Sequence, residues 1–441
     1  MFIIIYSKGA TKKMKICKII KNSTTIKNGI WLYVLQFFNT VFPLITLPYV
    51  TRVLGTYNYG IFSYALNIVT YFQVLVEYGF NLSGSRKIAI SRSKTEKENI
   101  YSRIVTSKLL LLFISFIILL IIIVISNFLY EQIVTIFIMF LIVIGTALTQ
   151  SWVFQGEQRM KYVTISNAMI RLIFMILTFM LVKNGSHKYI YSIIYSSVFI
   201  FIGICQILLI RKIFDYKYKV CNLKECLQEI KDGWYVFTTT MMSKILTGIG
   251  ITILGLKNGD NTLEIGIYSA IQKIPTILNM VYAPIGQALF PYISKKYRED
   301  YDFSIKLIKN IIIIIVTMLL ISTLIVILFS EKIIGVAFGT EYVKYHYILI
   351  PLTIWAFLGM INNVLGIQGL VAQNKTKEYS KAFSISCILT LILNIILVLR
   401  FEVWGIALAT LGSEFILTLM LILELIKIKN KKISMEKNNG D

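Results

Sequence analysis

Charged residues are scarce in this sequence, and their scarcity excludes a water-soluble globule. Only 15% of the 441 residues are Asp, Glu, Lys or Arg, whereas 56% are hydrophobic, and the mean hydropathy is +0.73. Soluble domains carry about 25% charged residues. Most of the protein surface must therefore face lipid, which makes the bilayer the first partner of the chain.

Histidine and cysteine are also rare, which argues against metal and redox chemistry. The two histidines, His187 and His346, fall in expected outer loops, and Cys221 and Cys226 have no second pair beside them. The five cysteines lie in expected helices or cytoplasmic segments, where disulfides are rare; they are Cys17, Cys205, Cys221, Cys226 and Cys387. We expect no cofactor and no metal ion.

Signatures of an enzyme are missing as well. No glycine-rich loop ends in Lys-Ser or Lys-Thr, so this chain is not expected to hydrolyse ATP. Asp300 and Asp302 have the spacing of a carboxylate pair that holds a metal–nucleotide, but no nucleotide-binding domain surrounds them. We predict that the chain is not an enzyme.

The N-terminus lacks the features of a cleaved signal. The apolar stretch Met1–Tyr6 is too short for a signal core and precedes lysines instead of a cleavage site. We therefore expect no cleaved signal. Met14 is a candidate for the native start, with residues 1–13 as an extension.

Long apolar runs dominate the remainder, and they do not alternate as the strands of a β-barrel would. Runs such as Leu109–Ile125 and Ile311–Phe329 approach or reach the length that a helix needs to cross a membrane. The sequence therefore predicts an all-α integral membrane protein of about twelve spans. These lie near 30–50, 59–80, 104–126, 131–153, 162–182, 189–210, 234–256, 264–290, 306–329, 345–371, 380–399 and 402–426.

The positive charge gathers in alternate loops. The chain has 45 Lys and Arg against 22 Asp and Glu, a net charge of +23. A basic chain can bind nucleic acid, but most of these residues fall on one side of the predicted spans, as the positive-inside rule describes. We therefore expect a bacterial inner-membrane protein with both termini in the cytoplasm, and no nucleic-acid partner.

The chain divides into two similar halves. The longest polar interruption, 211–233, separates six spans in 30–210 from six in 234–426, and basic segments 1–29 and 427–441 flank them. A short pattern bridges the first two spans of each half: Leu54-Gly55 with Gly60-Ile61-Phe62-Ser63, and Leu254-Gly255 with Gly266-Ile267-Tyr268-Ser269. Six-span repeats keep one orientation, which predicts two lobes about an axis along the membrane normal, with a central cleft.

Polar side chains recur at helical spacing on the first and second spans of each half. In lipid such stripes mark faces turned toward protein or water. We predict a cavity lined by Gln36, Asn39, Asn67 and Gln272, among other residues. Hydrogen bonding between helices is an open alternative for some of the Ser and Thr.

Charges within predicted spans are the stronger signal, because a mid-helix Lys or Arg costs about 2.5–3.5 kcal/mol on insertion scales. Lys244 and Lys273, on neighbouring polar spans, predict an anion-binding site and a cationic cavity. Arg171 either joins that site or forms a buried ion pair. Arg52 either guards the outer exit or sits at the interface, and Glu77 is the candidate for a coupled proton or cation.

Two segments resemble known landmarks. Residues 28–32 (Asn-Gly-Ile-Trp-Leu), 43–55 (Pro-Leu-Ile-Thr-Leu-Pro-Tyr-Val-Thr-Arg-Val-Leu-Gly) and 59–60 (Tyr-Gly) are similar to the opening of Wzx-type O-antigen and polysaccharide flippases. Residues 152–157 (Trp-Val-Phe-Gln-Gly-Glu) resemble a second landmark of that family. Thr56 departs from the pattern, since proline is frequent there.

This resemblance implies membership of the multidrug/oligosaccharidyl-lipid/polysaccharide exporter superfamily. It implies twelve spans, a cationic cavity, and turning of undecaprenyl-diphosphate-linked oligosaccharides from the cytoplasmic to the outer face. It also implies polysaccharide-assembly membrane proteins as partners. Two alternatives stay open: a multidrug/cation antiporter of the same fold, which should carry intramembrane carboxylates, and a membrane polysaccharide polymerase, which should carry a large outer loop.

Overall fold

The computed structural model describes residues 24–126, 128–257 and 262–438, and within these ranges the chain forms helices and no strand. Nine helical stretches of this part are long and apolar enough to cross a membrane. The prediction of an all-helical membrane protein is thereby confirmed. Each predicted span falls on helical residues, and the count of twelve crossings stays a prediction.

The first half of the chain supplies the helices up to residue 213. They are α2 (Thr24–Glu77), α3 (Phe80–Ile90), α4 (Lys94–Ile125), α5 (Tyr130–Met139), α6 (Leu141–Leu148), α7 (Ser151–Gly156), α8 (Met160–Leu181), η1 (Gly185–His187) and α9 (Lys188–Ile213). Predicted span 131–153 is therefore divided among three short helices.

The second half contains fewer but longer helices. They are α10 (Leu223–Lys257), α11 (Thr262–Ile271), α12 (Lys273–Glu299), α13 (Tyr301–Phe338), α14 (Thr340–Val343), η2 (His346–Ile348), α15 (Leu349–Asn363), η3 (Val364–Leu370), η4 (Val371–Gln373) and α16 (Thr376–Asn438). The segment η3 is a π-helix.

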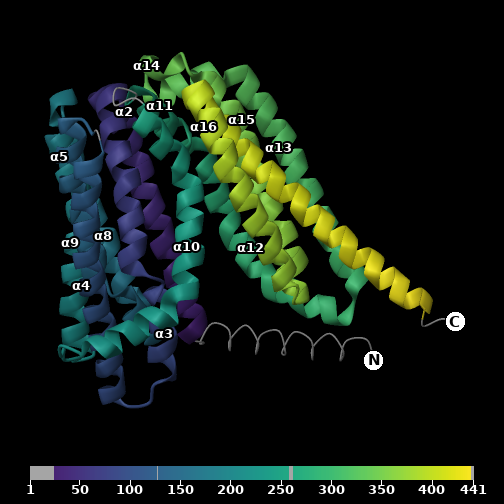
Figure 1. Ribbon diagram of the computed structural model, residues 1–441, viewed down its shortest axis with the longest axis horizontal. Helices are drawn as coiled ribbons and strands as arrows, with labels where there is room; N and C mark the ends of the chain where they lie inside the picture. Colours follow the sequence, from purple (N-terminus) through teal and green to yellow (C-terminus); the bar gives the residue numbers. More distant parts are fainter. Residues whose placement is uncertain (1–23, 127, 258–261, 439–441) are drawn as a thin grey trace, which may run out of the picture.

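The helices form two groups that meet at one end and diverge toward the other (Figure 1). One group holds α2, α4, α5, α8 and α9, the other holds α12, α13, α15 and α16, and α10 and α11 stand between them. The groups meet near α11 and α14, which we call the Gly55 end. They diverge toward α3 and the last turns of α16, which we call the α3 end.

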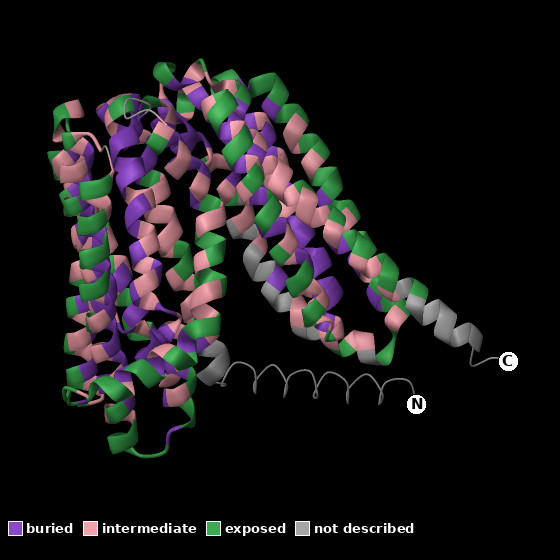
Figure 2. Ribbon diagram, viewed as in Figure 1, coloured by how far each residue is buried: buried purple, intermediate pink, exposed green. Residues whose placement is uncertain are grey.

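The described residues form two apolar cores: the larger runs through the first group and continues into the second at residues such as Phe338 and Ile406, and the smaller lies within the second group. The first core includes Val50 and Trp152, and the second includes Phe357 and Leu421. In Figure 2 buried residues run through the first group and the Gly55 end, whereas exposed residues run along α13. Between residues 311 and 328 the exposed side chains of α13 are almost all apolar, as a lipid-facing surface requires.

Two long helices each contain a break, at Gly55 in α2 and at Glu402 in α16. Gly55 has φ 72°, which only glycine adopts without strain. Glu402 has φ 53°, and its carboxylate accepts a hydrogen bond from Lys257 at 3.1 Å. The predicted loops between spans one and two, and between eleven and twelve, are therefore sharp bends.

The repeated glycines contact each other's helix at the Gly55 end. A Cβ atom on Gly60 would lie 1.6 Å from the carbonyl oxygen of Thr262, and one on Gly266 would lie 2.2 Å from that of Thr56. Each threonine precedes its own glycine by one helical turn, so the contact is reciprocal. Only hydrogen fits at either position, and this brings α2 and α11 into backbone contact.

The segment between the halves is attached to the first group by its carboxylates. Lys87 of α3 contacts Glu229 at 2.7 Å and Asp232 at 2.9 Å, and Arg103 contacts Glu225 at 3.2 Å. Before α10, Asp215 accepts a hydrogen bond from Lys94, which lowers the pKa of that carboxyl. The start of α10 is thus held against α3 and α4.

Alanine at Gly60 or Gly266 should separate α2 from α11. The added methyl group meets backbone atoms that cannot move aside locally, and such overpacking costs about 1–3 kcal/mol. Ser269 is buried one turn after Gly266. In a cysteine-free background carrying Ser269→Cys, we expect either alanine variant to be alkylated several-fold faster by a water-soluble maleimide. Gly29→Ala, where no atom lies within 4 Å of the new Cβ, is the control. Equal alkylation rates in all variants would contradict the conclusion that the two glycines hold α2 against α11.

Candidate functional site

Two lysines expose their ammonium groups between the helix groups. Lys244 on α10 and Lys273 at the start of α12 are both exposed, and each lies within electrostatic range of the other. They lie at similar depths, about 16–20 Å from the Gly55 end at about 1.5 Å per helical residue. The structure therefore brings together the two cations that the sequence singled out.

Neither lysine has an anionic partner among the described residues. No ion pair or hydrogen bond from described side chains reaches either ammonium group. A contrast is Lys108, which is buried and donates to the carbonyl oxygen of Thr149 at 2.7 Å. Because a lysine in hydrocarbon is costly, two unpaired ammonium groups at this depth indicate a water-filled space that can accept an anion.

The predicted neutral residues divide into two sets. Gln36 is exposed on α2, and Gln272 lines a cavity beside Ser243 and Thr247 of α10. Asn67, in contrast, donates to the carbonyl oxygen of Gly248 at 3.1 Å and to Thr252 Oγ1 at 2.9 Å. The amide of Asn67 thus holds α2 against α10, which is the helix-to-helix bonding that the sequence left open.

Arg52 lies at the Gly55 end, away from the two lysines. Its guanidinium donates to the carbonyl oxygen of Val336, near the negative end of α13. A second bond joins the same segments: Glu341 Oε2 of α14 accepts a hydrogen bond from the backbone N–H of Thr56 of α2 at 3.1 Å. Residues 52–56 and 336–341 are therefore joined by one side chain from each segment. Sequence reasoning did not identify Glu341.

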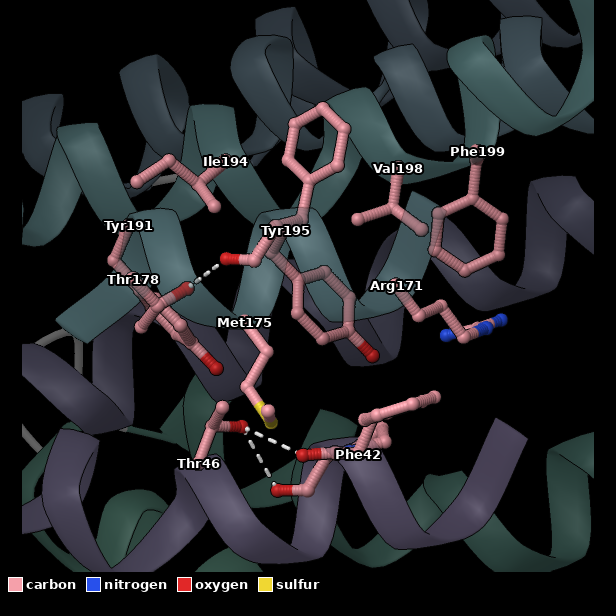
Figure 3. A pocket seen from close by; sticks show the side chains of 12 residues that line it. Phe42, Thr46, Arg171, Met175, Thr178, Tyr191, Ile194, Tyr195, Val198 and Phe199 are labelled. Carbon is pink, nitrogen blue, oxygen red and sulfur yellow. Dashed lines mark hydrogen bonds between the residues drawn. The ribbon is translucent and has the colours of Figure 1, made fainter. Parts of the chain in front are cut away.

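Arg171 lies in a separate pocket of about 50 Å³ between α2, α8 and α9 (Figure 3). The predicted alternative of a buried ion pair is not found: no described carboxylate contacts the guanidinium, and its buried Nε has no hydrogen-bond partner. Phe199 lies 5.8 Å from the guanidinium carbon. Such a cation–π contact contributes about 0.5–2 kcal/mol, less than the cost of about 2.5–3.5 kcal/mol for a mid-helix arginine.

Glu77 and Glu414 are two carboxylates that bear on ion coupling. Glu77 accepts a hydrogen bond from Asn81 near the α3 end. Glu414 of α16 lines a cavity of about 130 Å³ and accepts a hydrogen bond from Asn362 at 2.5 Å. Most other polar groups of this cavity are hydroxyls, from Ser243, Thr247, Ser386, Thr390, Thr410 and Ser413.

Sequence reasoning missed the cavity around Glu414. Asn362 and Asn363 interrupt an otherwise apolar span, and this signal could have identified the helix that faces Glu414. Among the described residues no group of three His, Cys, Asp or Glu side chains gathers as a metal site would require.

Comparisons with known proteins agree with this architecture. The profile of the family described as polysaccharide biosynthesis protein matches residues 25–297. A protein of Shigella dysenteriae, named as a candidate O-antigen transporter, is 30% identical over 403 residues, which cover 90% of this chain and 98% of that protein. A protein of Escherichia coli (strain K12) with the same name is 29% identical over 92% of this chain and 97% of its own length.

Solved structures share the fold at low sequence identity. The lipid II flippase MurJ in an inward closed conformation aligns with a TM-score of 0.66 at 16% identity, covering 93% of this chain and 91% of that one. A multidrug resistance transporter of the MATE family, in an inward-facing conformation, aligns with a TM-score of 0.63 at 15% identity over 90% and 96% of the chains. On the strength of the profile and the Shigella relative, this chain belongs to the polysaccharide biosynthesis protein family.

Proposed function

We propose that this protein is a flippase for lipid-linked oligosaccharides. It turns undecaprenyl-diphosphate-linked repeat units, of the kind used for O-antigen or capsule, from the cytoplasmic to the outer face of the inner membrane by alternating access. The relatives named for O-antigen transport and the fold shared with a lipid II flippase support the cargo. The observation that carries the proposal is the pair of unpaired ammonium groups at Lys244 and Lys273.

The two lysines suit the passage of the charged diphosphate through the membrane, which is the most costly step of the transport. The prenyl tail can stay in lipid, but the diphosphate and the sugars must cross about 30 Å of hydrocarbon. Lys244 and Lys273 bind the diphosphate, because ionised partners make the stronger hydrogen bonds. Gln36, Asn39 and Gln272 bond sugar hydroxyls along the route, and Asn67 holds α2 against α10 beside it.

We propose twelve crossings arranged as two lobes, 30–210 and 234–426, joined by the cytoplasmic linker 211–233. The breaks at Gly55 and Glu402 divide α2 and α16 into two crossings each. The reciprocal contact of Gly60 and Gly266 supports a pseudo-two-fold axis, since equivalent residues of the two halves exchange equivalent contacts. Both termini and the α3 end face the cytoplasm, where the positive-inside rule puts the basic loops.

In this orientation the structure is closed toward the outer face. Arg52 and Glu341 then join the two halves at the outer exit, while Lys244 and Lys273 face a space that opens toward the cytoplasm. An inside-negative potential favours outward movement of an anion by about 2.3 kcal/mol per charge per 100 mV. Other polysaccharide-assembly proteins in the same membrane would supply and consume the cargo.

A multidrug/cation antiporter is the second candidate, because the fold is shared with a MATE transporter. Glu414, in its hydroxyl-lined cavity, is the single feature that favours it. A cationic drug would however be repelled by Lys244 and Lys273. In a flippase, the carboxylate of Glu414 would instead bind a coupled proton or cation, so its presence fits both functions.

Replacing Lys244 or Lys273 with Gln should abolish most of the surface polysaccharide at unchanged protein level. A charged hydrogen bond contributes about 1.5–3 kcal/mol, so each loss should reduce transport about tenfold or more. Surface polymer is measured by gel in cells whose own flippase gene is deleted, and protein amount by immunoblot. Lys231→Gln, exposed on the same helix, should retain full polymer. Full retention in both test variants would refute the binding role.

The coupled ion is tested at Glu77 and Glu414. Glu414→Gln keeps a side-chain oxygen for Asn362 but removes the charge, so accumulation of cargo driven by a proton or sodium gradient should be lost in proteoliposomes. Glu77→Gln should have a smaller effect, because Glu77 lies near the α3 end outside the cavity. Glu331→Gln, on an exposed side chain, is the control. Gradient-driven accumulation that survives in both variants would remove these carboxylates from the coupling.

A further inference from the structure

The pocket around Arg171 has aromatic walls and one cationic group. Its rings come from Phe42 of α2, Phe174 of α8, and Tyr191, Tyr195 and Phe199 of α9. Figure 3 shows the guanidinium beneath the ring of Phe199, with Phe42 on the opposite side and the hydroxyl of Tyr195 between them. The Arg171 side chain therefore projects into a defined space.

The charge of Arg171 is left without a counter-ion by the described chain. No described carboxylate contacts it, and no hydrogen bond is made by its buried Nε. Buried polar atoms almost always have partners. An unpartnered, buried guanidinium nitrogen on a side chain that lines a pocket therefore indicates an anionic ligand with acceptor atoms.

This pocket is distinct from the space that Lys244 and Lys273 face. Its lining comes from α2, α8 and α9 alone, all within the first helix group, and includes no residue of α10 or α12. The protein thus presents two separate cationic sites within its spans. A role of Arg171 in the same site as the two lysines stays a prediction, and neither lysine lines the pocket around Arg171.

The size and depth of the pocket restrict the ligand. One water needs about 10–15 Å³ of such space, so a cavity of about 50 Å³ holds a group of roughly four or five heavy atoms. A phosphate group fits this space. Arg171 lies near the middle of α8, about 16 Å from either end at about 1.5 Å per residue, far from the level of resident lipid headgroups.

We propose that Arg171 forms a second oxyanion site, for one phosphate group, inside the first helix group. The guanidinium pairs with the phosphate oxygens, a geometry that arginine matches better than lysine. The phosphate belongs to the translocated lipid, to an anionic phospholipid or to solution. Only the first source rests on the proposed function.

Phosphate binding is measured on the purified full-length protein without any transport. In nanodiscs of zwitterionic lipid, at constant ionic strength, inorganic phosphate should raise the Tm of the wild type and of the Lys244→Gln/Lys273→Gln double variant. The same titration should leave the Tm of Arg171→Gln unchanged. General salting-out by phosphate acts on all three proteins alike, so only the difference between variants counts.

The source is then separated by lipid composition. If phosphatidylglycerol nanodiscs raise the wild-type Tm and remove the response to free phosphate, the site takes a phospholipid headgroup. If phosphatidylglycerol nanodiscs leave the Tm response to free phosphate intact, the site takes a water-borne phosphate or the cargo. Adding undecaprenyl diphosphate should then remove the Tm response to free phosphate. A failure of this site leaves the cargo role of Lys244 and Lys273 untouched, since those residues are tested by surface polymer.

A second measurement does not depend on folding of the variant. In wild-type protein with ¹⁵N-labelled arginine, ³¹P should dephase one guanidinium signal in solid-state NMR, and Arg171→Lys should remove that signal. Equal stabilisation of wild type and Arg171→Gln by phosphate would overturn the proposal. Absence of any ³¹P dephasing in phosphate-treated wild type would overturn it as well.

Discussion

The backbone contact between Gly60 and Gly266 is the constraint on which the rest of the structure depends. It brings α2 and α11 together without side chains between them, so the two helix groups meet at one end. The Arg52 and Glu341 bonds reinforce the same end. Lys244 on α10 and Lys273 on α12 are exposed instead of buried, and they lie within electrostatic range of each other.

The presence or absence of a bonding partner separates structural from functional polar residues within the helices. Lys108 is buried but donates to a backbone carbonyl, and Asn67 bonds α10 across the helix contact. Lys244, Lys273 and Arg171 have no such partner among the described residues, although each lies within a predicted span. Since an unpaired charge in lipid is costly, a chain keeps such a residue only where water or an anion compensates it.

Much of the fold and part of the site could be predicted from the sequence. Hydropathy fixes where helices cross, and the cost of a charge in lipid identifies Lys244 and Lys273 without coordinates. Three features escape such reasoning because they depend on distances between remote segments. These are the bond of Arg52 to residue 336, the enclosure of Arg171 by α9 rings, and the pairing of Glu414 with Asn362. The repeated glycines were visible, but their mutual contact was not.

Transport by the purified protein tests the central claim most directly. Proteoliposomes containing this chain alone receive a fluorescent undecaprenyl-diphosphate oligosaccharide, and a membrane-impermeant glycosidase reports which leaflet holds it. The account predicts that cargo confined to one leaflet becomes cleavable from the other side, and that protein-free vesicles show no such change. It also predicts that the same lipid with a neutral link in place of the diphosphate crosses poorly. Equal rates for the charged and neutral lipids, or no movement of the charged one, would contradict it.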